Sequence, residues 1–127
     1  MSLGDWAENA LLDWLLGGSS PSRPSARYVS LHTADPGDNG ANELTGTGYA
    51  RPAVTFGAAS SGVASNSATA TFSNSGGTAW AEATHFGIWT LASGGSFLGS
   101  GSLSVARAIA AGTSATFAAG DLDATLS

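Results

Sequence analysis

The densest group of oxygen-bearing side chains lies between residues 35 and 43, which read Asp-Pro-Gly-Asp-Asn-Gly-Ala-Asn-Glu. The side chains here that could offer oxygens to a calcium ion include Asp35, Asp38, Asn39 and Glu43. Calcium takes about six to eight oxygen ligands, and the EF-hand pattern fails here because Gly37 stands third and Gly46 twelfth. Asp and Asn also favour turns for backbone reasons. An exposed loop is therefore the favoured interpretation, and we predict no metal and no cofactor.

A hydrolytic site would need a nucleophile, a base and an orienting group. The two histidines, His32 and His85, both lie inside strand-like runs, and no Gly-x-Ser-x-Gly elbow is present. Packed, hydrogen-bonded histidines are the expected reading, and no catalytic residue is assigned. A small glycan-active enzyme stays open as a lesser alternative. It would require Asp or Glu side chains that converge in a cleft.

Aromatic side chains raise the possibility of a sugar-binding platform. Trp89, Phe86 and Phe97 fit better as core or interface anchors, because large aromatic side chains dominate cores and interfaces. Trp80 follows a Ser/Gly-rich loop and is the least secure core member. We therefore count it among the candidate contact residues.

Composition narrows the partner classes. Of the 127 residues only 10% are charged, the net charge is -5, and all four basic residues are scattered arginines. A nucleic-acid or anionic membrane surface would need clustered Lys or Arg, so neither partner is expected. The absence of cysteine excludes disulfides and thiolate metal sites. No apolar run reaches the length of a membrane span, and the N-terminus lacks the basic start of a signal peptide.

An amphipathic helix is predicted over residues 3–16, with Ser2 as N-cap, Asp5 completing a capping box and Gly17 as the stop. One apolar stripe recurs at helical spacing: Leu3, Trp6, Ala7, Ala10, Leu11, Trp14 and Leu15. A helix this short is marginal alone. The stripe must dock either on its own sheet or on a neighbouring subunit. Residues 18–25, rich in Pro and Ser, form a linker that could let the helix reach away.

Strand patterns dominate from residue 26 onward. Thr84–Leu91 is the strongest central strand, and Gly94-Gly95 turns it into a hairpin with 96–103. The other candidates are 27–33, 49–56 (an edge or bulge because of Pro52), 63–72, 105–109, 114–118 and 122–126. The expected fold is mainly β, an antiparallel β-sandwich or jelly-roll-like barrel preceded by one N-terminal amphipathic α-helix. The expected organisation is a helix (1–17), a linker (18–25) and one β-sandwich domain (26–127).

Several segments together resemble a family of short bacteriophage virion proteins, commonly labelled tail-fibre or head-decoration proteins. One difference from the family pattern follows the aromatic of the central hairpin, where Thr90 and Leu91 stand in place of an expected acidic residue. The segments that carry the resemblance are Leu-Leu-Asp-Trp-Leu-Leu-Gly (11–17), Tyr-Val-Ser-Leu-His-Thr-Ala-Asp-Pro (28–36), Gly-Tyr-Ala-Arg (48–51), Val-Thr-Phe-Gly (54–57), Thr-His-Phe-Gly-Ile-Trp (84–89) and Ala-Gly-Asp-Leu (119–122).

The resemblance implies a structural protein of the virion, assembled in the host cytoplasm, that is not an enzyme. A compact chain without shaft repeats favours a capsid decoration (cement) protein that binds the head lattice. The alternative is a tail-fibre, tail-tip or receptor-binding module that uses loops 34–48 and 73–80. Expected partners are the major capsid protein or tail proteins of the same particle. A homo-oligomer is also expected, with a trimer as the family-style guess.

Two sets of residues are the candidate functional sites. The helix stripe supplies the partner interface: Leu3, Trp6, Leu11, Trp14 and Leu15. The loops supply the contact residues: Asp35, Asp38, Asn39, Glu43, Tyr49, Arg51 and Trp80. Within the second set, Tyr49 and Arg51 are predicted to hold the long loop against the domain.

Overall fold

The computed structural model describes residues 1–126 of the chain. These residues contain eight strands and one helix. In chain order they are β1 (Ser2–Leu3), α1 (Asp5–Leu16), β2 (Tyr28–His32), β3 (Val63–Ser65), β4 (Ala70–Ser73), β5 (Ala83–Trp89), β6 (Phe97–Arg107), β7 (Ser114–Phe117) and β8 (Asp123–Thr125).

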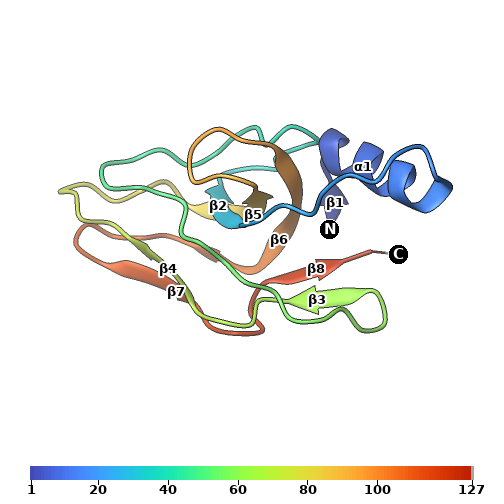
Figure 1. Cartoon of the computed structure of the whole chain (residues 1–127). Coiled ribbons are helices and arrows are strands. Elements are labelled where there is room, and N and C mark those ends of the chain that lie inside the picture. The colour runs from blue at the N-terminus through green and yellow to red at the C-terminus, as the bar shows by residue number, and fades with distance from the viewer. Residues whose placement is uncertain (127) are drawn as a thin grey trace.

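The strands form one larger sheet and two ribbons. The four-stranded sheet has the order β1-β6-β5-β2, while β3 pairs with β8 and β4 pairs with β7. All pairs are antiparallel. The ribbons lie along one side of the four-stranded sheet (Figure 1). The predicted class, mainly β with antiparallel sheets and one N-terminal helix, is confirmed, and the described residues form no closed barrel.

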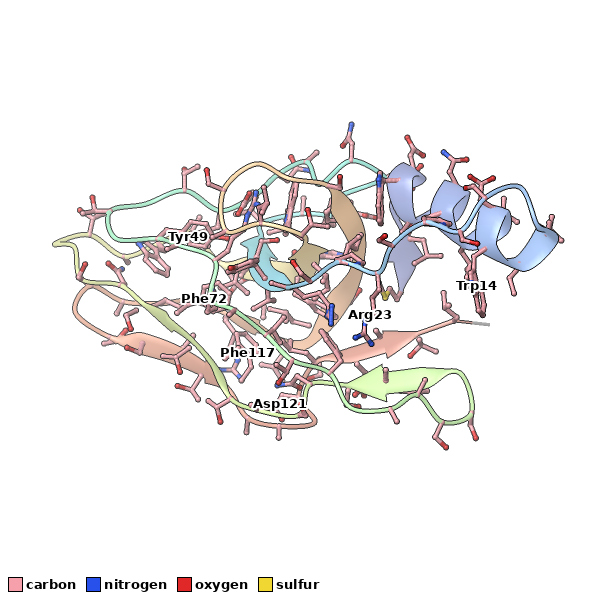
Figure 2. All side chains as sticks on the ribbon, viewed as in Figure 1. Trp14, Arg23, Tyr49, Phe72, Phe117 and Asp121 are labelled. Carbon is pink, nitrogen blue, oxygen red and sulfur yellow. The ribbon has the colours of Figure 1, made fainter. Side chains whose placement is uncertain are left out.

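The core lies between these layers because β4 and β7 alternate small or apolar side chains inward with hydroxyls outward. On β4, Ala70 and Phe72 are buried while Thr71 and Ser73 are exposed. Phe72 meets Phe117 of β7 edge-on at 6.0 Å between ring centroids, and Tyr49 stacks on Phe72 at 6.0 Å. Figure 2 shows these three rings in the interior. Such aromatic contacts add about 0.5–1.5 kcal/mol each beyond area burial.

The predicted central strand is confirmed as β5, which lies between β2 and β6. The predicted strand 49–56 is wrong. The backbone bonds Val29 N–H to Pro52 O and Val54 N–H to Arg27 O form only an isolated antiparallel bridge between Tyr28 and Ala53, not a continuous strand. Pro52 has no N–H to donate to a ladder, which breaks the pairing. The segment instead covers the outer edge of β2.

The predicted start of the helix is also wrong. Ser2 and Leu3 form β1, which pairs with Ser100 and Gly99 of β6, so Leu3 is not part of the helix stripe. The helix begins at Asp5 after Gly4, which makes no side-chain cap, so the expected Ser2 capping box is absent from the described structure. Ser2 is held in the antiparallel pair with β6 and therefore does not precede the helix as its N-cap.

Two strand boundaries differ from prediction. The candidate 63–72 divides into β3 and β4 because Asn66 turns the chain between them. Its side-chain amide donates to Ala68 O and Ala118 O. The candidate 105–109 is not a separate strand, since β6 continues to Arg107. Ala83 of β5 pairs with Arg107 and His85 pairs with Ser102, so the excess residues of β6 form a bulge.

Candidate functional site

Helix α1 lies at one end of the domain and is fixed there by its first residues. Gly4 N–H donates to Leu98 O at 3.0 Å, and Asp5 N–H donates to Asp38 O at 3.2 Å. At the other end Gly17 takes a left-handed φ of 83° and its N–H returns to Asp13 O, which confirms the predicted stop. Figure 1 shows the helix projecting at the end where both chain termini lie.

The apolar side chains of α1 face solvent to an unusual degree. None of its twelve residues, all of them described, is buried. Trp6 is 41% exposed and Trp14 is 63% exposed, while Leu11 is half-buried. In Figure 2 Trp14 projects from the helix, well apart from the aromatic interior. Exposed apolar side chains gathered in this way are typical of interaction surfaces, and partner contact through α1 stays a prediction.

A groove of about 460 Å³ separates α1 from the linker that follows it. The linker does not lead the helix away from the domain, since it folds back beside α1 on its way to β2 (Figure 1). The helix contributes Trp6, Ala7, Ala10, Leu11 and Trp14 to the lining, and the linker contributes Pro21, Ser22, Arg23 and Pro24. Trp6, Leu11 and Trp14 of the predicted interface thus meet in one groove. Leu15 lies outside this lining and is 60% exposed.

Glu43, Tyr49 and Arg51 form a polar cluster that joins the long loop to the sheet. Arg51 grips the Glu43 carboxylate with two bonds, Nε to Oε1 at 2.8 Å and Nη2 to Oε2 at 2.7 Å. Its Nη1 donates to the carbonyls of Leu91 and Gly94 in the β5–β6 turn. The guanidinium carbon also lies 3.8 Å above the Trp89 ring. Arg51 therefore ties two loops to the sheet at once.

Tyr49 bridges the same loop to β2. Its hydroxyl donates to Glu43 Oε1 at 2.9 Å and accepts from the Leu31 N–H at 3.1 Å. Burial raises the pKa of Tyr49, and the Glu43 carboxylate adds to that rise. Although burial opposes ionisation of Glu43, the bonds from Arg51 and Tyr49 lower the pKa of its carboxyl.

The seven predicted loop residues thus fall into two groups. Glu43, Tyr49 and Arg51 pack within the domain, and Trp80 is 5% exposed, with Nε1 donating to Thr47 O at 3.2 Å. Trp80 is thus a core residue, which leaves little of it exposed for the contact role it was also considered for. The exposed residues are Asp35, Asp38 and Asn39. Partner contact through these three stays a prediction.

The acidic loop is shaped by its own backbone. Asp35 Oδ1 accepts from the Gly37 N–H at 2.9 Å, and the Asn42 side chain donates to Asp35 O at 3.0 Å. Within residues 1–126, no three His, Cys, Asp or Glu side chains gather closely enough to hold a metal ion. The turn-forming reading of Asp and Asn accounts for the geometry seen here.

His32 lies at the centre of a hydrogen-bond chain that sequence patterns did not reveal. Nδ1 is 2.7 Å from Ala41 O, which can only accept, so Nδ1 carries the proton. Nε2 then accepts from Ser30 Oγ at 2.7 Å, and Ser30 Oγ accepts from Trp89 Nε1 at 2.9 Å. This chain defines a neutral imidazole that joins β2, β5 and the long loop. It agrees with a structural role for His32.

Acidification is expected to weaken the fold through His32. Burial lowers its pKa from the ordinary value of 6.5, against smaller opposing effects from Ala41 O and Glu43. Below about pH 6.5, His32 is therefore protonated more readily in the unfolded chain than in the folded chain. The free energy of unfolding falls as the pH drops through this range. His32→Asn should flatten this slope, measured by urea unfolding between about pH 7.5 and about pH 5.

His85→Asn is the matched control for that experiment and should keep the slope. The range stays above the ordinary value of 4.5 for Glu43, whose own lowered pKa adds a separate loss at lower pH. An unchanged slope in His32→Asn would contradict the assignment.

A second group of loops meets at the end of the domain opposite α1 (Figure 1). Asn74, which the sequence analysis did not single out, is 1% exposed and joins two of them, 75–79 and 110–113. Its side-chain amide donates to Thr78 O and Ile109 O, and its backbone carbonyl accepts from the Gly112 N–H. The three loops, 45–48, 75–79 and 110–113, carry no charged residue. We name them the loop end.

Helix α1, the one helix formed by residues 1–126, lacks the length and apolar character needed to cross a membrane.

Comparison with known proteins bears on the identity of the chain. Its residues 2–125 match the model of one protein family, described as podophage GP4 fiber I protein gp80. No curated protein matches the chain. The match extends from β1 to β8 and so includes α1, the long loop and the loop end. The chain therefore belongs to the family of the podophage GP4 fiber I protein gp80, a phage tail-fibre family.

Proposed function

We propose that this protein is a component of a phage tail fibre, attached to the particle by the end that carries α1 and acting without catalysis. The observation that carries this proposal is the family match across residues 2–125, because the matched family is one of phage fibre proteins. A virion structural protein follows directly from that membership. The match favours the tail-fibre alternative over capsid decoration, the main expectation from sequence.

The two ends of the domain support this arrangement because they differ in chemistry. The α1 end exposes Trp14 and Leu16, the latter 81% accessible, and such side chains gain about 1.5–3 kcal/mol each when a partner buries them. The loop end is uncharged and built from three short loops. Loops on a rigid scaffold commonly carry binding function. Attachment through α1 would leave the loop end free for the host surface.

The test is to delete the gene from the phage that encodes this chain and examine the particles. A fibre component predicts stable, filled heads with shortened or missing fibres and reduced adsorption. If the chain is a decoration protein, the deletion particles should adsorb normally but have heads of reduced stability. Antibody labelling of wild-type particles gives an independent location. Label spread over the head lattice would reject the fibre proposal.

The exposed tryptophans of α1 are expected to be needed for incorporation into particles. Trp6→Ser combined with Trp14→Ser should leave the β-domain folded, because neither side chain is buried. Incorporation should fall at least about ten-fold, since losing two partly buried aromatic contacts costs more than 1.4 kcal/mol. Quantitative mass spectrometry of purified particles measures it.

Val105→Ser is the matched control, because Val105 is 68% exposed on β6, away from the groove. If the double tryptophan variant is incorporated as well as the wild type, the proposal that α1 attaches the protein to the particle would be rejected.

A further inference from the structure

We infer that the outer face of α1 binds a different chain of the particle, through a segment that is apolar at one end and rich in Lys or Arg at the other. This inference rests on the proposed function in one respect only, that α1 attaches the protein to a particle. It commits to the chemistry of the partner, which the family match does not address.

Charge and apolar surface are separated along this face. The last turns of α1 expose Leu12, Leu15 and Leu16, at 54%, 60% and 81%. Asp5 and Glu8 lie in the first turns and are also exposed. Residues seven or eleven apart lie close to one line along a helix, so Glu8 precedes Leu15, and Asp5 precedes Leu16, on the same side. One face therefore carries leucines at one end and carboxylates at the other.

The long loop adds negative charge beside the first turn. Asp38 O accepts from the Asp5 N–H at 3.2 Å, which brings the loop against the start of the helix. The side chains of Asp35 and Asp38 are exposed there. α1 itself has no basic residue. The nearest arginine of the groove, Arg23, belongs to the linker on the side lined by the tryptophans.

A second copy of this chain fits the face poorly in either orientation. Two parallel helices would place Asp5 and Glu8 against the same carboxylates, and like charges brought together at an interface cost several kcal/mol. Two antiparallel helices would bury those carboxylates against Leu15 and Leu16, where nothing in α1 could neutralise them. Any homo-oligomer of the chain therefore uses another surface.

A partner segment with the complementary pattern matches both the leucine end and the carboxylate end of this face. Its apolar side chains would cover Leu12, Leu15 and Leu16. The free energy gained by burying these leucines exceeds the contribution of any single exposed ion pair. Its Lys or Arg side chains would face Asp5 and Glu8. They fix the direction in which the segment binds, because electrostatic complementarity sets register and excludes wrong partners.

Site-specific photo-cross-linking in assembled particles tests the inference. Benzoylphenylalanine replaces Leu16 in one phage stock and Thr116, on the outer face of β7, in a control stock. After irradiation, mass spectrometry identifies the cross-linked peptide. The expected product from position 16 joins this chain to a different virion protein, in a segment with at least two Lys or Arg within about two helical turns.

Cross-links from position 16 to a second copy of this chain, or to an acidic or uncharged segment, would overturn the inference. So would the absence of a cross-link in particles that contain normal amounts of the labelled chain. The outcomes for the proposed function are separate. A basic segment of the capsid protein would support this inference while rejecting the tail-fibre location.

Charge reversal supplies a second readout. Asp5→Lys combined with Glu8→Lys should reduce incorporation at least about ten-fold, and Glu substitutions at the cross-linked basic residues should restore it. Glu82→Lys is the control, because Glu82 is an exposed carboxylate on the segment before β5. Equal incorporation of both variants, each with a wild-type melting temperature, would contradict the charge pairing.

Discussion

Replacing Arg51 by alanine is expected to lower the free energy of unfolding by about 3 kcal/mol, or the melting temperature by roughly 10 °C. The Arg51 side chain is only 9% exposed and that of Glu43 is 23% exposed. Removing the guanidinium leaves a half-buried carboxylate and two carbonyls of the β5–β6 turn without their donors. Breaking a buried pair from one side costs more than the pair itself contributes.

The same variant should also loosen the long loop. Proteinase K cleavage within residues 34–48, under conditions where the rest of the domain stays folded, should be faster than in the wild type. Arg51→Lys should rescue little, because an ammonium cannot make the two parallel bonds to Glu43. A double-mutant cycle with Glu43→Gln measures the coupling. Wild-type cleavage in Arg51→Ala would show that the cluster does not hold the loop.

Replacing Gly87 by alanine is expected to cost about 3 kcal/mol or to prevent folding, a large effect for one methyl group. A Cβ at this position would lie 2.7 Å from Ser30 Oγ, 2.8 Å from His32 Nε2 and 2.9 Å from Phe97 Cε1. The first two atoms form the hydrogen bond that defines the neutral histidine. The methyl group must therefore displace a buried bond and a ring together.

Gly77→Ala is the matched control, because no described atom lies within 4 Å of its Cβ position. Chemical unfolding of the two variants should separate them by at least about 2 kcal/mol. If Gly87→Ala unfolds like the wild type, the hydrogen-bond chain tolerates displacement, and its proposed contribution to stability would be rejected.

Both predictions concern residues of the stretch from 28 to 57 and the hairpin around 84–95, which include segments that carry the family resemblance in the sequence. Arg51, Glu43, His32 and Gly87 contact one another or share a neighbour in the fold. Their roles are internal, because they connect loops to the sheet. The surfaces proposed for partner contact lie elsewhere, on α1 and at the loop end.

Periodicity predicted the regular elements well where side-chain burial follows one simple rule. The strand-like run 84–91 with the Gly94-Gly95 turn after it identifies β5, and the 3.6-residue spacing of Trp6, Ala10 and Trp14 identifies a helix up to Gly17. These patterns depend on neighbours in the chain. The failures at 49–56 and at Ser2 depend on distant partners, since Pro52 lies against β2 and Ser2 pairs with β6.

The sequence by itself determined an antiparallel β fold with one N-terminal amphipathic helix, a surface with few charges and a resemblance to phage virion proteins. Local spacing, turn residues and composition carry that information without reference to the folded chain. Only the tertiary structure decided that Trp80 is buried, that Arg51 binds the Glu43 carboxylate, and that no residue of α1 is buried. Those outcomes depend on contacts between residues far apart in the chain, and one sequence does not specify which apolar faces meet.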